Sequence, residues 1–161
     1  MAQESVITEE MRHLIGAETP PHTFEVEKGA LRKFLNATGD TNPLFRDEEW
    51  ARKTEYGGII APPTFFCPDA LIAGQVTGLK RVPNPFRYSI DGGSEWESFQ
   101  PVRVGDTLSI TTKIADIYEK QGSARTGRML FTIVEATCRN QRGELVGICR
   151  GVSISYEGPK Q

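Results

Sequence analysis

The chain has 161 residues and a formal net charge of -2, from 19 basic and 21 acidic side chains. At roughly 100 to 200 residues per domain, this length predicts a single domain over residues 1–161, and the balanced charge argues against a nucleic-acid partner. The longest apolar run, near residues 59–67, contains Pro62 and Pro63 and falls far short of the ~20 residues of a membrane span, so no membrane partner is expected.

The residues up to about 76 show helical patterns. Apolar Leu31, Phe34 and Leu35 fall at helical spacing, and Gly39 can take the left-handed conformation that ends a helix. Asp47 is a good N-cap and predicts a short helix through residues 50–52. A third helix is expected from about Thr64 to Gln75.

From Tyr88 onward the hydrophobic period changes from helical to alternating. Strands are predicted near residues 88–100, 106–119, 127–140 and 144–156. Leu108, Ile110 and Ile114 alternate with polar residues, and Val146, Ile148, Val152, Ile154 and Tyr156 show the same alternation, which is typical of half-buried strands. Gly92 and Gly93 suggest a bulge or a close approach. Helices followed by antiparallel strands indicate an α+β fold, with one sheet packed on a helix.

The cysteines and histidines give no sign of a metal site. Three cysteines and two histidines show no CxxC, HxxxH or HExxH spacing, and structural zinc needs four such ligands brought together. The first residues lack the pattern of a secretory signal, and the odd number of cysteines argues against a disulfide framework. We therefore expect a cytoplasmic protein with reduced, buried thiols and with no metal or cofactor.

The most informative segment is 39–47, Gly-Asp-Thr-Asn-Pro-Leu-Phe-Arg-Asp. Taken alone, it predicts a helix end at Gly39 and an Asx-type turn built from Asp40, Asn42 and Pro43. Together with segments 20–27, 56–65 and 93–106, however, it resembles the MaoC-like, (R)-specific enoyl-thioester hydratase family, and in particular its FAS1-like dehydratase N-terminal branch. The resemblance covers nearly the whole chain.

This resemblance implies a hot-dog fold, in which an antiparallel sheet wraps around a long central helix. It also implies dimers that bind acyl thioesters of coenzyme A or of acyl carrier protein in a tunnel where two protomers meet. By position it assigns a catalytic role to Asp40 and substrate-binding roles to Asn42, Phe45, Ile60, Ala61, Pro63, Thr64, Phe65 and Gly93.

The sequence departs from the family pattern at the reacting centre. Active members carry Gly-Asp-x-Asn-Pro-aliphatic-His, and the aspartate and histidine share the water that is added or removed. Here Phe45 stands at the histidine position. Active members also carry Ile-x-His-Gly before the central helix, where a backbone N–H holds the thioester oxygen. This chain has Ile60-Ala61-Pro62-Pro63, and proline has no N–H, which leaves Thr64 as the next donor.

Three hypotheses follow for the function. In the first, the chain is a hydratase or dehydratase subunit that shapes the acyl-thioester site, while a MaoC-like partner carrying the Asp–His pair supplies catalysis in a heterodimer. In the second, it is a self-sufficient homodimeric hydratase that uses Asp40 with an unrecognised base. In the third, it is an acyl-thioester binding module without lyase activity. Lys80, Arg81 and Arg87 are candidate contacts for the phosphates of coenzyme A, although such residues are usually plain surface.

Overall fold

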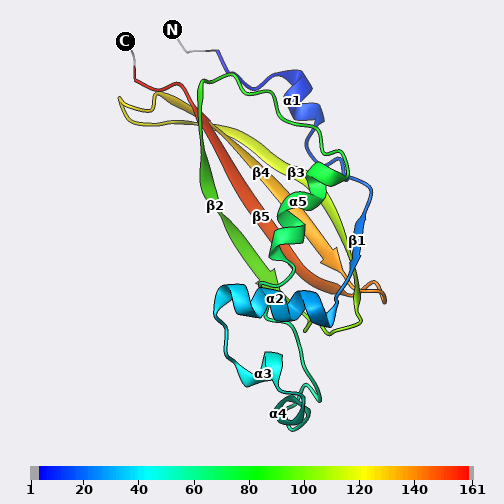
Figure 1. Ribbon diagram of the computed structural model, residues 1–161. Coiled ribbons are helices and arrows are strands. Elements are labelled where there is room, and N and C mark those ends of the chain that lie inside the picture. The colour runs from blue at the N-terminus through cyan, green and yellow to red at the C-terminus, as the bar shows by residue number, and fades with distance from the viewer. Residues whose placement is uncertain (1–3, 160–161) are drawn as a thin grey trace.

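The computed structural model describes residues 4–159, with the backbone alone at Leu71. These residues form a curled antiparallel sheet with a helix against its concave face (Figure 1). In sheet order the strands are β1 (His22–Glu25), β3 (Thr107–Gln121), β4 (Arg128–Arg139), β5 (Leu145–Tyr156) and β2 (Tyr88–Ser98). The helices are α1 (Glu9–His13), α2 (Lys28–Thr38), α3 (Pro43–Arg46), α4 (Glu48–Arg52) and α5 (Cys67–Val76). The expected α+β architecture is confirmed.

The four strands predicted after residue 88 are all present, within two residues of their expected bounds. Every pair of neighbouring strands is antiparallel. The bulge expected at the paired glycines is also confirmed, because the register between β2 and β5 shifts between Asp91 and Gly93. Gly93 has a φ of 102° there, a conformation that glycine adopts without strain.

The two early helices are confirmed as well. α2 buries Leu31 and Leu35 and ends at Gly39, which has a φ of 69°. Asp47 caps α4, since its carboxylate accepts the backbone N–H groups of Glu49 and Trp50 at 2.9 and 3.0 Å. These two caps hold the ends of the loop that carries the Gly-Asp-Thr-Asn-Pro motif.

The expected start of the third helix is wrong. The prediction placed it near Thr64, whereas α5 begins at Cys67 with Phe66 as its N-cap. Residues 63–66 form a turn instead, in which the N–H of Phe65 donates to the carbonyl of Pro62 at 2.9 Å. Pro68 explains the difference. A helix starting at residue 64 would need an N–H at position 68, whereas the observed start leaves Pro68 in the first turn.

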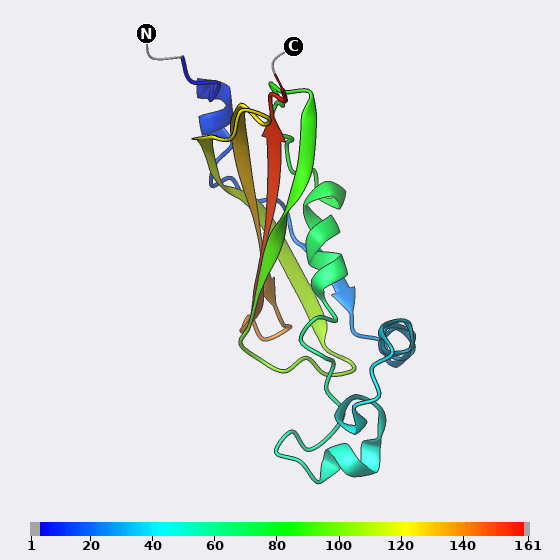
Figure 2. The same ribbon diagram turned by 90° about the vertical axis from the view of Figure 1, so that its left-hand side faces the viewer.

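α5 lies off the centre of the sheet. It packs mainly against β3 and β4 and less against β5, and Figure 2 shows it on one side of the sheet, with α2, α3 and α4 beyond its lower end. Gly74 permits the close approach, because a Cβ there would lie 2.9 Å from Cγ2 of Thr112. The main core lies between α5, α2 and the inner face of the sheet, and includes Leu31, Leu35, Phe66, Ala70, Ala73, Leu108, Ile110 and Cys138.

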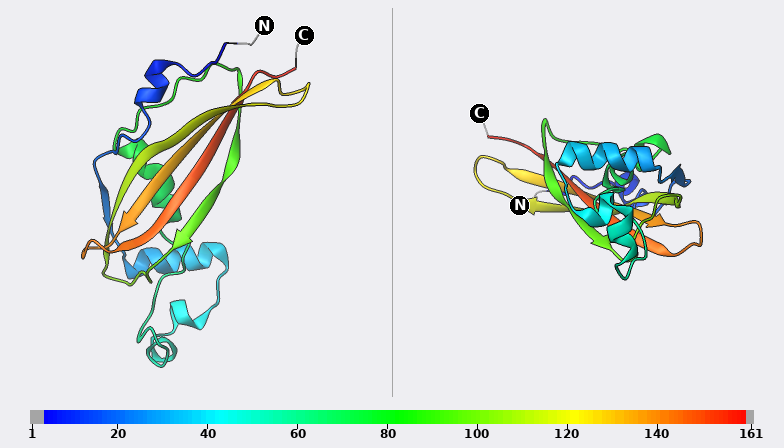
Figure 3. Two further views of the ribbon diagram at one scale, coloured as in Figure 1. Left: turned by 180° about the vertical axis from the view of Figure 1, so that it is seen from behind. Right: turned by 60° about the horizontal axis from the view of Figure 1, so that its bottom comes forward.

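β5 carries its large apolar residues on the face away from α5. Gly147 faces the ring of Phe66 and Cys149 is 2% exposed, so by alternation the residues facing α5 are Gly147, Cys149, Gly151, Ser153 and Ser155. The outward residues are Ile148, Arg150, Val152, Ile154 and Tyr156. The predicted strand is confirmed, but its alternating apolar residues, apart from Val146 in the core, form the outer face. Among the described residues, no helix covers that face (Figure 3, left).

The three cysteines are buried and unbridged, as predicted. In the part of the chain from residue 4 to residue 159, no helix is both long enough and apolar enough to cross a membrane.

Candidate functional site

The motif loop uses its polar side chains to hold its own backbone. The Asp40 carboxylate accepts the N–H of Asn42 at 2.9 Å, and the Asn42 side-chain oxygen accepts the N–H of Leu44 at 3.0 Å. Arg46 ties the loop to α2, since it donates to the Asp40 carbonyl at 2.6 Å and to the Asn36 side chain at 3.0 Å. The predicted Asx-type turn is therefore confirmed, and one Asp40 oxygen is engaged in it.

Phe45, at the position of the family's histidine, lies in apolar surroundings. Its half-buried ring packs against the main core and lines a cavity of about 360 Å³ with Leu31, Leu35 and Ile59. Lys28, Arg32 and Arg46 surround this cavity on the α2 side. A phenyl ring in this place can exclude water but can neither donate nor accept a proton.

Three of the expected substrate-binding residues come together in a second, smaller cavity. Ile60, Ala61 and Pro63 line a space of about 230 Å³ with Tyr56 and residues 98–102. The segment is held by backbone pairing, because Ile60 forms an antiparallel bridge with Arg103 and the Ala61 N–H donates to Val102 at 2.7 Å.

The other expected site residues lie elsewhere. Thr64 is exposed and, within residues 4–159, its backbone N–H donates to no acceptor. Phe65 is 7% exposed and packs edge-to-face on Phe34, with ring centroids 5.6 Å apart. Gly93 sits at the β2 bulge and lines neither of these two cavities. The sequence-predicted residues thus divide between two cavities, the core and the sheet edge.

A further hollow lies between α5, residues 77–87 and the inner faces of β4, β5 and β2, and we call it the concave groove. Two adjoining cavities of about 510 and 570 Å³ share Gln75, Leu79 and Ser89. Small residues leave the space open, namely Ala70, Gly74, Ala136, Cys149 and Gly151. This groove was not predicted, because it arises where segments distant in sequence both lack large side chains.

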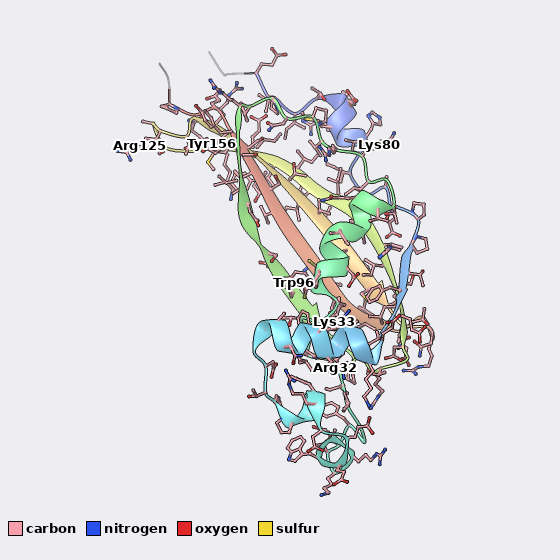
Figure 4. All side chains as sticks on the ribbon, viewed as in Figure 1. Arg32, Lys33, Lys80, Trp96, Arg125 and Tyr156 are labelled. Atoms are coloured by element: carbon pink, nitrogen blue, oxygen red, sulfur yellow. The ribbon has the colours of Figure 1, made fainter. Side chains whose placement is uncertain are left out.

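One end of the groove carries basic side chains. Lys80 and Arg81 line one end, and neither forms an ion pair within the part of the chain that is described. Figure 4 shows Lys80 and Trp96 near opposite ends of α5. Arg87 is placed differently, with its guanidinium 5.8 Å from the centre of the Tyr88 ring. This basic end is therefore suited to an anionic group, whereas the rest of the lining combines apolar residues with polar ones, including Asp91, Thr112 and Ser153.

The titratable groups near α5 do not supply the acid–base pair that the family's chemistry needs. Cys149 lines the groove, but burial raises the pKa of its thiol to about 11, so it is not a thiolate nucleophile at neutral pH. Burial also raises the pKa of Asp69, in the first turn of α5, while His22 on β1 partly opposes that shift. Asp69 was not predicted as a site residue, because its only signal in the sequence is a carboxylate within an apolar helix.

Comparison with known proteins places this geometry in a family. The model of the FAS1-like dehydratase domain region matches residues 13–148. The UPF0336 protein of Streptomyces avermitilis is 34% identical over 111 residues, which are 68% of this chain and 74% of that protein. A protein described as a probable enoyl-CoA hydratase alpha subunit, from Thermomonospora curvata, is 30% identical over 149 residues, which are 81% of this chain and 44% of that protein.

Solved structures share the fold. The HadBC complex, a (3R)-hydroxyacyl-ACP dehydratase from Mycobacterium tuberculosis, matches with a TM-score of 0.72 and 24% identity, over 88% of this chain and 97% of that chain. Other structural neighbours are described as MaoC-like dehydratases and (R)-hydratases. The chain therefore belongs to the FAS1-like dehydratase domain family and has the hot-dog fold of the MaoC-like dehydratases.

Proposed function

We propose that this chain is the acyl-thioester-binding subunit of a hydratase or dehydratase whose partner subunit supplies the Asp–His pair. The observation that carries the proposal is the motif loop. Its aspartate and asparagine cap the backbone, and the position of the base holds a phenyl ring packed against the core. General acid–base catalysis of water addition requires a positioned, titratable group, and Phe45 cannot provide one.

The concave groove supports the binding half of the proposal. Its volume lies within the several hundred Å³ usual for small-molecule sites, and its small residues leave room for an extended apolar chain. Lys80 and Arg81 at one end suit the phosphates of a coenzyme A or carrier-protein thioester. The acyl chain would then lie beneath α5 with its anionic carrier near residues 80–81.

The free edge of the sheet supports the partner. β2 is an edge strand of eleven residues in which only Trp96 is not exposed, and such an edge offers unpaired N–H and C=O groups to another strand. On the nearby helix, Ile72 and Val76 are 47% and 64% exposed. A partner that pairs with β2 and covers α5 would close the open side of the groove. A relative described as an alpha subunit, and the structural match to the HadBC complex, agree with this arrangement.

A substitution on α5 tests the partner surface. Val76→Lys places a charge on the exposed side of the helix, and we expect it to weaken association by about 30-fold or more with little change in the stability of the chain. Val104→Lys is the matched control, because Val104 is also exposed, at 39%, but lies in the turn before β3 and belongs to neither α5 nor β2. Sedimentation velocity of each variant, alone and with co-purified partner, measures the effect. Equal assembly of both variants would contradict this placement of the partner.

Purification from the native host tests whether a partner subunit supplies the catalytic residues. We expect the tagged chain to bring down a second chain that contains Gly-Asp-x-Asn-Pro-aliphatic-His, identified by mass spectrometry, and the complex to hydrate crotonyl-CoA. If the isolated chain is fully active instead, Asp40→Asn and Asp69→Asn will show which carboxylate it uses, and the chain is a self-sufficient hydratase. If it binds thioester but no partner makes it active, it is a binding module.

A further inference from the structure

The outer face of the sheet, turned away from α5, carries an apolar row across four strands. Tyr118, Phe131, Ile154 and Ile90 are successive register partners on β3, β4, β5 and β2, and the adjacent row includes Ile133 and Val152. Ile90 is 50% exposed, and in the part of the chain from residue 4 to residue 159 no helix lies over this face (Figure 3, left). Antiparallel sheets with one solvated face usually place polar residues there. Here the row itself is apolar, and the ammonium of Lys120 lies over two of its rings, 5.1 Å from the centre of Tyr118 and 5.2 Å from that of Phe131.

A row of alternating charges lies beside the apolar rows. Lys113, Glu135, Arg150 and Glu95 are successive register partners on the same four strands. Lys113 pairs with Glu135 at 3.0 Å, and Arg150 pairs with Glu135 at 2.8 Å. Within the described residues Glu95 forms no ion pair, since Arg150 reaches Glu97 instead. Across the face, therefore, the signs run positive, negative, positive, negative.

We propose that this outer face binds the outer face of a second copy of the chain, about a two-fold axis that runs parallel to the strands between β4 and β5. Rotation about that axis reverses the strand order. Lys113 then faces Glu95 of the second copy, and Glu135 faces Arg150 of the second copy. A two-fold axis along the charge row would instead set each charge against its own kind, at a cost of several kcal/mol. The alternating charges select both the partner and the axis.

This contact is separate from the one at β2. Two sheets packed face to face lie about 10 Å apart with their strands nearly aligned, which leaves the β2 edge and the concave groove accessible. The outer face would therefore join two thioester-binding units back to back. The proposal goes beyond the proposed function and does not depend on turnover.

Chemical cross-linking tests the axis. Glu95→Cys and Lys113→Cys are made in separate chains that also carry Val76→Lys, so that assembly through α5 is weakened. The reagent is a bis-maleimide that spans about 10 Å, because this is the distance between two sheets packed face to face. The native cysteines are buried, so the introduced cysteines are the expected sites of reaction. We expect a mixture of the two chains to cross-link and each chain alone not to, because like positions are offset by three strand spacings, about 14 Å. No product in the mixture, or equal product from either chain alone, would overturn the proposal.

A charge-reversal cycle tests the contact without a cross-linking reagent. Glu95→Lys and Lys113→Glu should each weaken self-association by about tenfold, and the double variant should regain it, because opposite charges again face each other. Sedimentation velocity over a concentration series measures this, and urea midpoints show that each variant is folded. Additive losses in the double variant would contradict the pairing. A chain that remains monomeric at all concentrations would exclude a second copy. So would an unrelated polypeptide that binds this face and protects it.

Discussion

The two faces of β5 differ in a way that reverses the usual relation between inside and outside. The inner face carries glycine, serine and cysteine, and the outer face carries isoleucine, valine and tyrosine. Small inner residues leave the concave groove open between β5 and α5, although Cys149 also belongs to the main core. On the outer face Tyr156 stacks on Tyr88, but no helix within residues 4–159 covers this face (Figure 3, left). The comparison indicates that the inner face is shaped for a ligand and that the outer face is shaped for another protein.

Two glycines on the inner face of β5 have different surroundings. One is packed against other atoms, and the other faces the open groove. A Cβ at Gly147 would collide with the ring of Phe66 and lie 2.8 Å from the carbonyl oxygen of Glu97, whereas a Cβ at Gly151 would meet no atom within 4 Å. We expect Gly147→Ala to destabilise the fold by about 3 kcal/mol and Gly151→Ala to change stability by about 0.5 kcal/mol at most. Urea unfolding of both variants measures the contrast, and equal losses would show that Gly151 also serves packing.

A larger residue at Gly151 should affect ligand binding instead. Gly151→Leu places a side chain in the concave groove, and we expect it to weaken binding of octanoyl-CoA by about tenfold, roughly the loss of one or two buried methylene contacts. Acetyl-CoA is the matched ligand, because its short acyl group needs little of the groove. Isothermal titration with both thioesters tests this, and an unchanged affinity for octanoyl-CoA would place the acyl chain elsewhere.

On the outer face, the ion pairs of Glu135 should make the stability of the fold depend on pH. Burial raises the pKa of Glu135, but hydrogen bonds from Lys113 and Arg150 outweigh it, so the folded-state pKa lies below the usual 4.5. The folded state then binds this proton less tightly than the unfolded state, and the stabilisation is complete above the unfolded pKa and is lost as the pH falls through the folded pKa.

We therefore expect Glu135→Gln to cost about 1 kcal/mol near pH 7 and the difference from the parent to shrink at pH values below 4.5. Glu25→Gln on β1 is the control, because Glu25 is exposed and forms no ion pair within residues 4–159. Urea midpoints at several pH values measure both variants. A constant difference across the pH range would show that the side chain contributes shape and not charge.

Local patterns in the sequence predicted the elements but not the surfaces between them. Alternation located β3, β4 and β5, and the glycine and aspartate caps located α2 and α4, because these signals depend on neighbouring residues. Alternation does not say which side of β5 faces the helix, so the apolar outer face could not be predicted. The groove is lined by Gly74 on α5 and Gly151 on β5, which are far apart in the sequence. The five-residue α1, which was not predicted, lacks the length for a clear helical period.

The motif loop is the place where sequence and structure agree most closely on function. Its Asx turn follows from Asp40 and Asn42, and the loss of the base follows from Phe45, both of which can be read from one short segment. The equivalence of Phe45 to the family's catalytic histidine stays a prediction, as do the substrate-binding roles expected for Thr64 and Gly93. No local signal reports how a partner would complete such a site.

The central claim is that this chain binds an acyl thioester without its own acid–base pair. The most direct test is the initial rate of crotonyl-CoA hydration by the rigorously purified isolated chain, compared with the same chain in its native complex. We predict that the isolated chain is slower by at least ~10²-fold, the usual loss when a positioned acid or base is missing, and that Phe45→His restores weak, pH-dependent activity. Equal rates for the isolated chain and the complex, with loss of activity in Asp40→Asn, would contradict the account.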